Sequence, residues 1–389
     1  MSTIIETIHS LQLHNKLVVL HNCGTRSHKA LLAKLTTSCT VVDMASPVVR
    51  MQVEQNAAAF VSSLQTMAMP LYLANIDYAP QVLTLLLQDA GLPLGSISAS
   101  CNQTHYLQEE CAGENAGRIA FLELPLTVAA SVPFVPTADV LQTLQDAGRT
   151  TNILENILLG FMADKDEADS YVQRILRQEI AGLAGPKDDL KFYRFLCAAA
   201  SLTALPVNTA RLGDMVGVSL PTVRRWLNLL AGAGIVYFVQ PVANIPKKRL
   251  VKAPKMFFRD TAVACALLQL ANSNYLLRSI NYGRIYETYV VNSIREGYLE
   301  QGREAKLTFF QDSNYKEITI ILEVAGVLYP MLITTGEYKT AKVAKLFSVL
   351  EPYAAEHALA MGNGVVVVPH GDTKQLQDRL WQVNVTSIL

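Results

Sequence analysis

The sequence predicts a multidomain α/β protein, and three observations lead to that expectation. Residues 1–136 alternate short apolar runs with helical patterns, which is typical of a largely parallel sheet. Residues 191–271 contain two short helical patterns around a glycine, followed by two apolar runs that a basic segment joins. Residues 272–389 return to alternating strands and helices. A chain of 389 residues is long enough for two to four units with separate cores.

Five apolar runs in the first segment are expected to form strands. They are "KLVVL", "CTVVDMA", "MPLYLANI", "GSISAS" and "RIAFLELPL", and helical patterns such as "SHKALLAKL" and "APQVLTLLLQDAG" separate them. Residues 137–190 then become helical, and the turn-forming string "GPKDD" marks a boundary near their end.

The third segment has a helix-turn-helix pattern followed by a wing. The first helix is expected to bury one apolar face, formed by Leu212, Met215 and Val216. Gly217 permits a tight turn and Ser219 can cap the second helix. That helix is expected to bury Val223, Trp226, Leu227 and Leu230. The strands "IVYFVQP" and "MFF", joined by the basic string "VANIPKKRLVKAPK", describe the wing.

The last segment predicts a second α/β module. Its expected helices cover residues 283–302 and 340–359. Its expected strands cover residues 306–310, 317–324, 327–335 and 364–369.

Charge is balanced over the whole chain but unevenly distributed. The sequence has 33 basic and 33 acidic residues, yet residues 191–260 carry eleven bases against two acids, Asp214 and Asp260. The bases are Lys191, Arg194, Arg211, Arg224, Arg225, Lys247, Lys248, Arg249, Lys252, Lys255 and Arg259. This basic segment of net charge +9 in an otherwise acidic chain favours a phosphate-rich or acidic partner.

Composition also sets the expected compartment and argues against metal chemistry. The chain starts without a basic segment that leads into an apolar one, and no long uncharged apolar stretch is present, so a cytoplasmic protein with no membrane contact is expected. The six cysteines form no C-x-x-C pair, and the histidines form no pair at metal-binding spacing. We therefore expect free thiols and no metal site.

The stretch "NCGTRSHKALLAKL", residues 22–35, stands where a nucleotide-binding protein places its phosphate loop. Such a loop reads G-x-x-x-x-G-K-[ST], in which the lysine reaches the phosphates and the hydroxyl holds Mg²⁺. A residual phosphate site is expected to consist of Gly24, Arg26 and Lys29. Ala30 stands where the motif has the hydroxyl residue. No cofactor is expected, and the alternative left open is residual ATP binding with little dependence on Mg²⁺.

Several strings, in their order along the chain, resemble a prokaryotic family of AAA-type ATP-binding proteins with a winged helix and a C-terminal nuclease-like domain of unknown function. "VANIPKKRLVKAPKMFFRDTAVACALL" is similar to the family segment N-x-x-K-R-x-x-K-x-P-K-x-Y-F-x-D-x-G. "GRIYETYVVNSI" resembles the helix G-x-x-F-E-x-x-V, and "AGRIAFLELPLT" the segment that follows the sensor strand. The resemblance implies a P-loop NTPase-like domain at 1–136, a helical lid at 137–190, a winged helix at 191–271 and a restriction-nuclease-like α/β domain at 272–389.

The same resemblance implies that both reaction centres are degenerate. Active members end a strand in Asp-Glu, where this chain has Ala74 and Asn75, so the carboxylates that organise Mg²⁺ and the attacking water are absent. In the nuclease-like domain the chain keeps Glu287 and Glu317. The positions of the other expected carboxylates and of the lysine are occupied by Thr319, Leu332 and Thr334. No nuclease activity, no catalytic residues and no metal are therefore expected.

The resulting hypothesis is a catalytically degenerate AAA-type relative that serves as a DNA- or partner-binding scaffold. The residues expected to contact double-stranded DNA are Asn208, Thr222, Arg224, Arg225, Lys247, Lys248, Arg249 and Lys252. Two alternatives stay open: an ATP-binding protein with weak or unconventional ATPase activity, and a protein-interaction scaffold that meets an acidic partner without DNA. The oligomeric state is not predicted.

Overall fold

The computed structural model describes residues 2–21, 26–88, 93–101, 107, 118–126, 133–146, 152–162, 165–174, 189–243, 245 and 250–388. The chain divides into two units by its internal contacts. The first comprises residues 1–132, 232–234 and 298–303, and the second comprises residues 133–231, 235–297 and 304–389.

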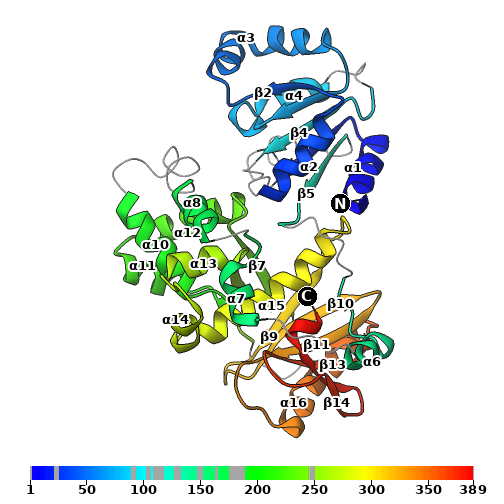
Figure 1. The fold of residues 1–389 in the computed structure, drawn as a ribbon, viewed down its shortest axis with the longest axis vertical. Helices are drawn as coiled ribbons and strands as arrows, with labels where there is room; N and C mark the ends of the chain where they lie inside the picture. The colour runs from blue at the N-terminus through cyan, green and yellow to red at the C-terminus, as the bar shows by residue number, and fades with distance from the viewer. Residues whose placement is uncertain are drawn as a thin grey trace. The chain divides into compact units, whose positions relative to one another are not determined.

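The first unit is built on a five-stranded, all-parallel sheet (Figure 1). Its strands are β1 (Leu17–His21), β2 (Thr40–Asp43), β3 (Leu71–Ala74), β4 (Ile97–Cys101) and β5 (Ile119–Glu123). They lie in the order β2-β3-β4-β1-β5, and each neighbouring pair is parallel. All five strands expected from apolar runs are therefore present, and the sheet is consistent with a P-loop NTPase-like fold.

Helices cover both faces of this sheet. They are α1 (Ser2–His14), α2 (Arg26–Thr36), α3 (Pro47–Gln65) and α4 (Gln81–Gln88), with the short turn η1 (Ile76–Tyr78) before α4. Val18 and Leu20 of β1 share one core with α1 and α2, whereas Leu17 and Val19 share the other core with α3 and α4. Because successive residues of β1 serve opposite faces, both of which are buried, the strand is continuously apolar in sequence.

The second unit combines helices with a larger sheet. Its helices are α6 (Ala138–Asp146), α7 (Ile153–Leu159), α8 (Lys165–Arg174), α10 (Asp189–Ser201), α11 (Thr209–Val216), α12 (Leu220–Gly232), α13 (Thr261–Leu267), α14 (Ser273–Arg278), α15 (Tyr282–Leu299), α16 (Thr340–Phe347) and α17 (Glu351–Glu356). Its strands are β6 (Leu205–Pro206), β7 (Val236–Pro241), β8 (Lys255–Phe258), β9 (Lys306–Gln311), β10 (Glu317–Val324), β11 (Val327–Ile333), β12 (Ala360–Met361), β13 (Gly364–Val368), β14 (Lys374–Gln377) and β15 (Leu380–Asn384).

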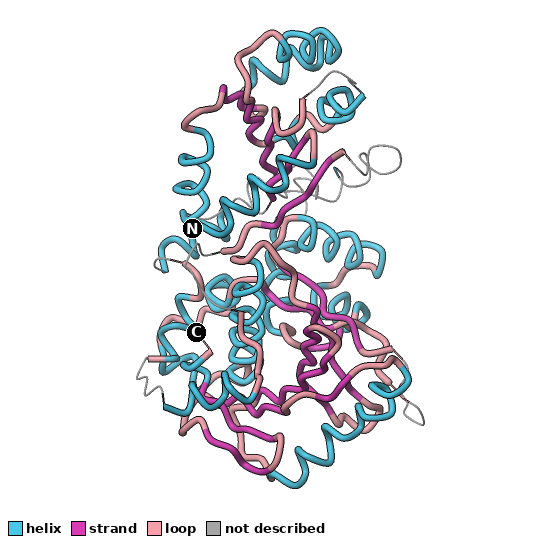
Figure 2. The backbone as a smooth tube through the Cα atoms, turned by 90° about the vertical axis from the view of Figure 1, so that its right-hand side faces the viewer, coloured by secondary structure: helices cyan, strands magenta, loops and turns pink. Residues whose placement is uncertain are grey.

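One sheet runs through the second unit, in the order β14-β15-β13-β11-β10-β9-β7-β8-β6, with β12 beside β11 (Figure 2). The strands β6–β8 are joined to the strands β9–β15 by a short parallel pairing, in which Gln240 of β7 faces Thr308 of β9. The strands expected for the wing and those expected for the last segment thus share one hydrogen-bonded layer. The domain boundaries proposed at 190 and 271 stay predictions, and the sheet is continuous across the second of them.

The helical expectations hold for α12 but fail in two places. Val223, Trp226, Leu227 and Leu230 are buried as expected. Met215, expected on the buried face of α11, is 49% exposed, because only Leu212 and Val216 of that set turn toward the core. The single helix expected at 340–359 is instead α16 and α17 separated by a 3₁₀ turn at Ser348–Leu350, and Pro352 lies in the first turn of α17.

Two expectations from composition concern the whole chain. Among the residues that the structure describes, no disulfide includes Cys39, Cys101, Cys197 or Cys265. Within the same residues, no helix combines the length and the apolar character needed to cross a bilayer.

Candidate functional site

The first candidate site is the carboxyl-terminal edge of the parallel sheet, where ligands bind in open α/β folds. The loop that joins β1 to α2 contains Gly24, which lies outside the described residues. Arg26 and Lys29 lie in the first turns of α2, directly after that loop, and their side chains also lie outside the description. The backbone therefore places Arg26 and Lys29 in the helix that begins at this edge, and their contacts stay predictions.

Ala74 and Asn75 lie at the carboxyl end of β3, at the same edge of the sheet. Asn75 has a left-handed backbone (φ 55°), and its backbone N–H donates to Ser100 Oγ at 3.3 Å. Its side-chain amide donates to Asp43 Oδ1 at 2.8 Å, at the end of the neighbouring strand β2. This amide holds a carboxylate in place. A neutral amide cannot act as the base that a carboxylate supplies in hydrolysis.

The second candidate site is the exposed face of α12 and the segments beside it. Arg224 and Arg225 are exposed, as expected, whereas the Thr222 hydroxyl hydrogen-bonds Ser219 Oγ at 2.9 Å. Asn208 caps α11 by accepting from the backbone N–H of Arg211 at 2.9 Å. Two of the eight side chains expected to contact DNA, those of Asn208 and Thr222, are therefore partly occupied by capping.

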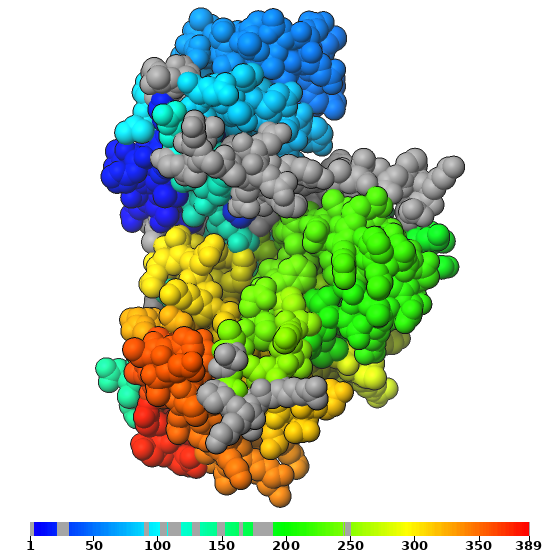
Figure 3. Space-filling model, turned by 180° about the vertical axis from the view of Figure 1, so that it is seen from behind, coloured from blue at the N-terminus to red at the C-terminus, as the bar shows by residue number. Residues whose placement is uncertain are grey.

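Lys252 is the one proposed wing contact inside the described residues. Its side chain is exposed, and its segment is tied to that of Asn208 because Val207 N donates to Pro254 O at 2.8 Å. Lys247, Lys248 and Arg249 lie outside the described residues. Figure 3 shows the surface of the segment that contains α10, α11 and α12 in green.

The third site is a buried ion cluster formed by Glu287 and Glu317, which the sequence analysis singled out, and by Lys255, whose role there it missed. Lys255, the first residue of β8, has a fully buried side chain. Its ammonium donates to Glu287 Oε1 of α15 at 2.7 Å, to Glu317 Oε1 of β10, and to the backbone oxygen of Thr319 at 3.4 Å. Gln311 Nε2 donates to the second oxygen of Glu317 at 2.7 Å. Residues from β8, α15 and β10 thus meet at one nitrogen atom.

The protonation of this cluster follows from burial and from mutual charge. Burial by itself would lower the pKa of Lys255, but the two carboxylates outweigh burial and hold that pKa above its ordinary value. Burial raises the pKa of Glu287 to about 7, with the charge of Glu317 adding to the rise and the ammonium opposing it. The lysine is therefore charged at neutral pH, and it is shared by two acids of which one titrates near neutrality.

Lys255 and Arg259 were both counted in the basic segment, and the structure buries both. Arg259 lies 3.5 Å from Glu296 of α15, and the two side chains are 4% and 3% exposed. Acids from outside the basic segment neutralise these two bases. The net charge counted from the sequence therefore overstates the positive charge available at the surface.

The sequence of α15 contains a signal for the buried contact between Arg259 and Glu296. Arg284, Thr288, Asn292 and Glu296 recur every fourth residue, so they line one face of the helix. Two of them bond residues at or beside β8: Asn292 Nδ2 donates to Phe258 O at 3.0 Å, and the hydroxyls of Thr288 and Thr203 lie 2.9 Å apart. A polar stripe in a helix that is otherwise largely buried predicts buried partners, of which Arg259 is one.

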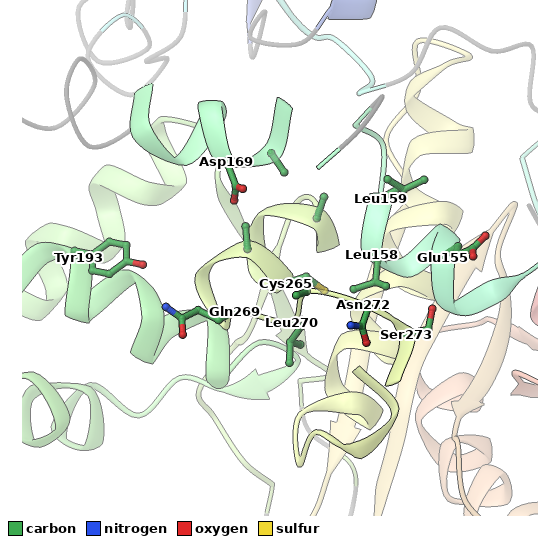
Figure 4. Close-up of a pocket in the computed structure, with 14 residues that line it drawn as sticks. Glu155, Leu158, Leu159, Asp169, Tyr193, Cys265, Gln269, Leu270, Asn272 and Ser273 are labelled. Carbon is green, nitrogen blue, oxygen red and sulfur yellow. The ribbon is translucent and has the colours of Figure 1, made fainter. Parts of the chain in front are cut away.

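The structure also holds a pocket of about 570 Å³ between α7, α8, α10 and α13 (Figure 4). Its lining mixes apolar side chains such as Leu158 and Leu270 with Asp169, Tyr193 and Gln269. None of the residues proposed for nucleotide or DNA contact lines it. This pocket is thus separate from all three candidate sites.

Comparisons with known proteins match two parts of the chain. Residues 159–274 match a domain of unknown function, DUF8612, and residues 282–388 match another, DUF4143. Among solved structures, the Walker-type ATPase PABY2304 of Pyrococcus abyssi is similar at 12% identity and a TM-score of 0.38, covering 68% of this chain and 94% of that one. A search of curated proteins found no match.

Proposed function

We propose that this chain is a noncatalytic relative of the AAA-type P-loop ATPases that acts by binding, and that one of its ligands is double-stranded DNA. The observation that carries the first part is the end of β3. Ala74 has no group that can bind a cation, and the amide of Asn75 is hydrogen-bonded to Asp43. Positioning and charge stabilisation supply nearly all of phosphoryl-transfer catalysis, so loss of these carboxylates removes the means of efficient hydrolysis.

The DNA-binding part of the proposal rests on α12 as the second helix of a winged helix-turn-helix. Arg224 and Arg225 are exposed on adjacent positions of that helix, and Arg211 and Lys252 are exposed on the segments beside it. Where arginine and lysine side chains contact phosphates, they fix the position of the protein without reading the base sequence. Because the oxygen of Asn208 and the hydroxyl of Thr222 are used in capping contacts, we propose binding that is largely independent of sequence.

The test is duplex binding as a function of salt. The unaltered chain should bind a short fluorescent duplex, with log K falling linearly as log salt rises. The double variant Arg224→Ala/Arg225→Ala should bind roughly tenfold more weakly or worse, and its salt slope should be shallower by about 1.8. Fluorescence anisotropy at several salt concentrations measures both quantities.

A matched control removes the same number of positive charges at another place on the surface. Lys342 and Lys345 are exposed on α16, in a part of the unit with no proposed DNA contact. Lys342→Ala/Lys345→Ala should therefore leave affinity and slope nearly unchanged. Equal weakening by the two double variants would contradict a site on α12, and absence of binding at low salt would favour the protein-scaffold alternative.

A further inference from the structure

Lys255 satisfies its three ammonium hydrogens with three oxygen atoms from two separate elements. An ammonium group has three N–H donors, and the oxygens within reach are Glu287 Oε1, Glu317 Oε1 and the backbone oxygen of Thr319. The ammonium nitrogen also lies over the ring of Phe309, 5.3 Å from the ring centroid. The cluster is therefore built around a cation, and this chain supplies that cation covalently.

Two carboxylates brought this close together repel one another unless a positive charge lies between them. Glu287 comes from a helix and Glu317 from a strand, and Gln311 fixes the orientation of Glu317 from the neighbouring strand. The two acids are still 15% and 24% exposed, so solvent reaches the outer side of the cluster. This is an oxygen-lined cation site with a solvent-facing side, and its cation is an ammonium group.

We propose that the Lys255 ammonium stands in for a divalent metal ion, so that this centre excludes metal in the native chain and becomes a metal site when the ammonium is removed. The residues of the native chain do not fit a metal ion, because the lysine nitrogen already occupies the point where the oxygens converge. Within the described residues, no group of three His, Cys, Asp or Glu side chains is arranged to hold a metal ion. The inference is independent of DNA binding and of ATP hydrolysis.

Once the ammonium is gone, two carboxylates are left facing the space that it occupied, and carboxylate oxygens are ligands of hard divalent ions. Ca²⁺ binds oxygens at about 2.3–2.6 Å, close to the 2.7 Å that separates Lys255 Nζ from Glu287 Oε1. One or two carboxylates with several waters are a common ligand set for divalent ions. The exposed side of the two glutamates leaves room for such waters.

The test uses the full chain with Lys255→Met, which removes the charge and keeps an unbranched apolar side chain at the buried position. Trp226 and Trp381, the two tryptophans of the sequence, both belong to the second unit, so their fluorescence reports its unfolding. Millimolar Ca²⁺ or Mn²⁺ should raise the Tm of Lys255→Met by roughly 5–10 °C relative to EDTA, and should not shift the unaltered chain. Lys252→Met, at an exposed lysine three residues earlier, should behave as the unaltered chain.

A second variant and a refolding experiment complete the test. Lys255→Met/Glu317→Gln should lose the metal response, because one of the two charged ligands is gone. If Lys255→Met unfolds in EDTA, it should regain its tryptophan signal when refolded with Ca²⁺ or Mn²⁺. Failure of both ions to shift or rescue Lys255→Met would overturn the proposal and leave a purely structural ion bridge. Binding of Mn²⁺ to the unaltered chain that Glu287→Gln abolishes would overturn it as well.

Discussion

Asp260 shows how a single buried acid in this fold makes stability depend on pH. Its carboxylate caps α13 by accepting from Ala262 N at 2.8 Å, and it also accepts from Phe161 N at 3.2 Å. Burial raises its pKa from 3.8 to about 7, and the two backbone donors only partly oppose that rise. Between these pH values the folded chain holds a proton that the unfolded chain has lost.

The sign of the pH effect follows from proton linkage. Because the folded state binds more protons between about pH 4 and about pH 7, the free energy of unfolding contributed by Asp260 falls as pH rises through that window. Asp260→Asn should lack this part of the pH dependence. The stability deficit of Asp260→Asn relative to the unaltered chain should therefore be larger at about pH 5 than at about pH 7.5.

Urea unfolding followed by tryptophan fluorescence at the two pH values measures this difference. Glu287, whose pKa is also raised to about 7 by burial, contributes equally to both proteins and cancels in the comparison. A deficit that grows with pH would show that Asp260 is stabilised in its charged form, against the expectation from its burial.

At the scale of elements, the ends of α7 and α11 depend on glycine for different reasons. Gly160 follows α7 at φ 53°, and a Cβ built there would lie 1.9 Å from Asp260 Oδ1 and 2.9 Å from Ala262 N. Gly217 ends α11 at φ 73°, and no atom lies within 4 Å of a Cβ built there. Both positions strain an alanine backbone, but only the first also forces a clash.

The paired variants separate backbone strain from steric clash. Gly217→Ala should lower the free energy of unfolding by about 1 kcal/mol, the cost of a left-handed alanine. Gly160→Ala should lower it by about 3 kcal/mol or more, because the cap of α13 must also move. Thermal and urea unfolding of both variants gives the comparison. Equal losses in the two variants would show that Asp260 does not pack against the end of α7.

The sequence predicted most elements because the buried strands are short and uniformly apolar. The runs of β1, β3 and β13 are buried on both faces, and a turn pattern ends each of them. The break between α16 and α17 was missed because Pro352 is acceptable in a first helical turn and so leaves the apolar period unbroken. Met215 was misplaced because a helix of eight residues has too few turns to fix its buried face.

The candidate sites also differ in how far the sequence could predict them. Arg224 and Arg225 were predictable, because an exposed helix face follows directly from the apolar positions on its other side. The role of Lys255 was not, since charge in a basic string predicts exposure, and its partners lie 32 and 62 residues further along the chain. Only the chain path through β8, α15 and β10 brings these three residues together.

At the scale of the whole molecule, each unit has one feature that bears on catalysis, and the two features differ in kind. In the first, neutral side chains stand at the end of β3, where acids would serve hydrolysis. In the second, an internal ammonium occupies the space between two acids. Under the function proposed above, both features belong to a chain that binds ligands and does not break their bonds. Nucleotide binding is a separate question, because Lys29 on α2 could contact a phosphate without Mg²⁺.

Mg²⁺-dependent phosphate release from ATP by the purified full chain tests the central claim most directly, with Lys29→Ala measured in parallel. We predict that the unaltered chain releases no more phosphate than Lys29→Ala at any Mg²⁺ concentration. ATP turnover that Lys29→Ala abolishes would contradict the account, because it would show that this sheet edge performs catalysis without the acids that Ala74 and Asn75 replace.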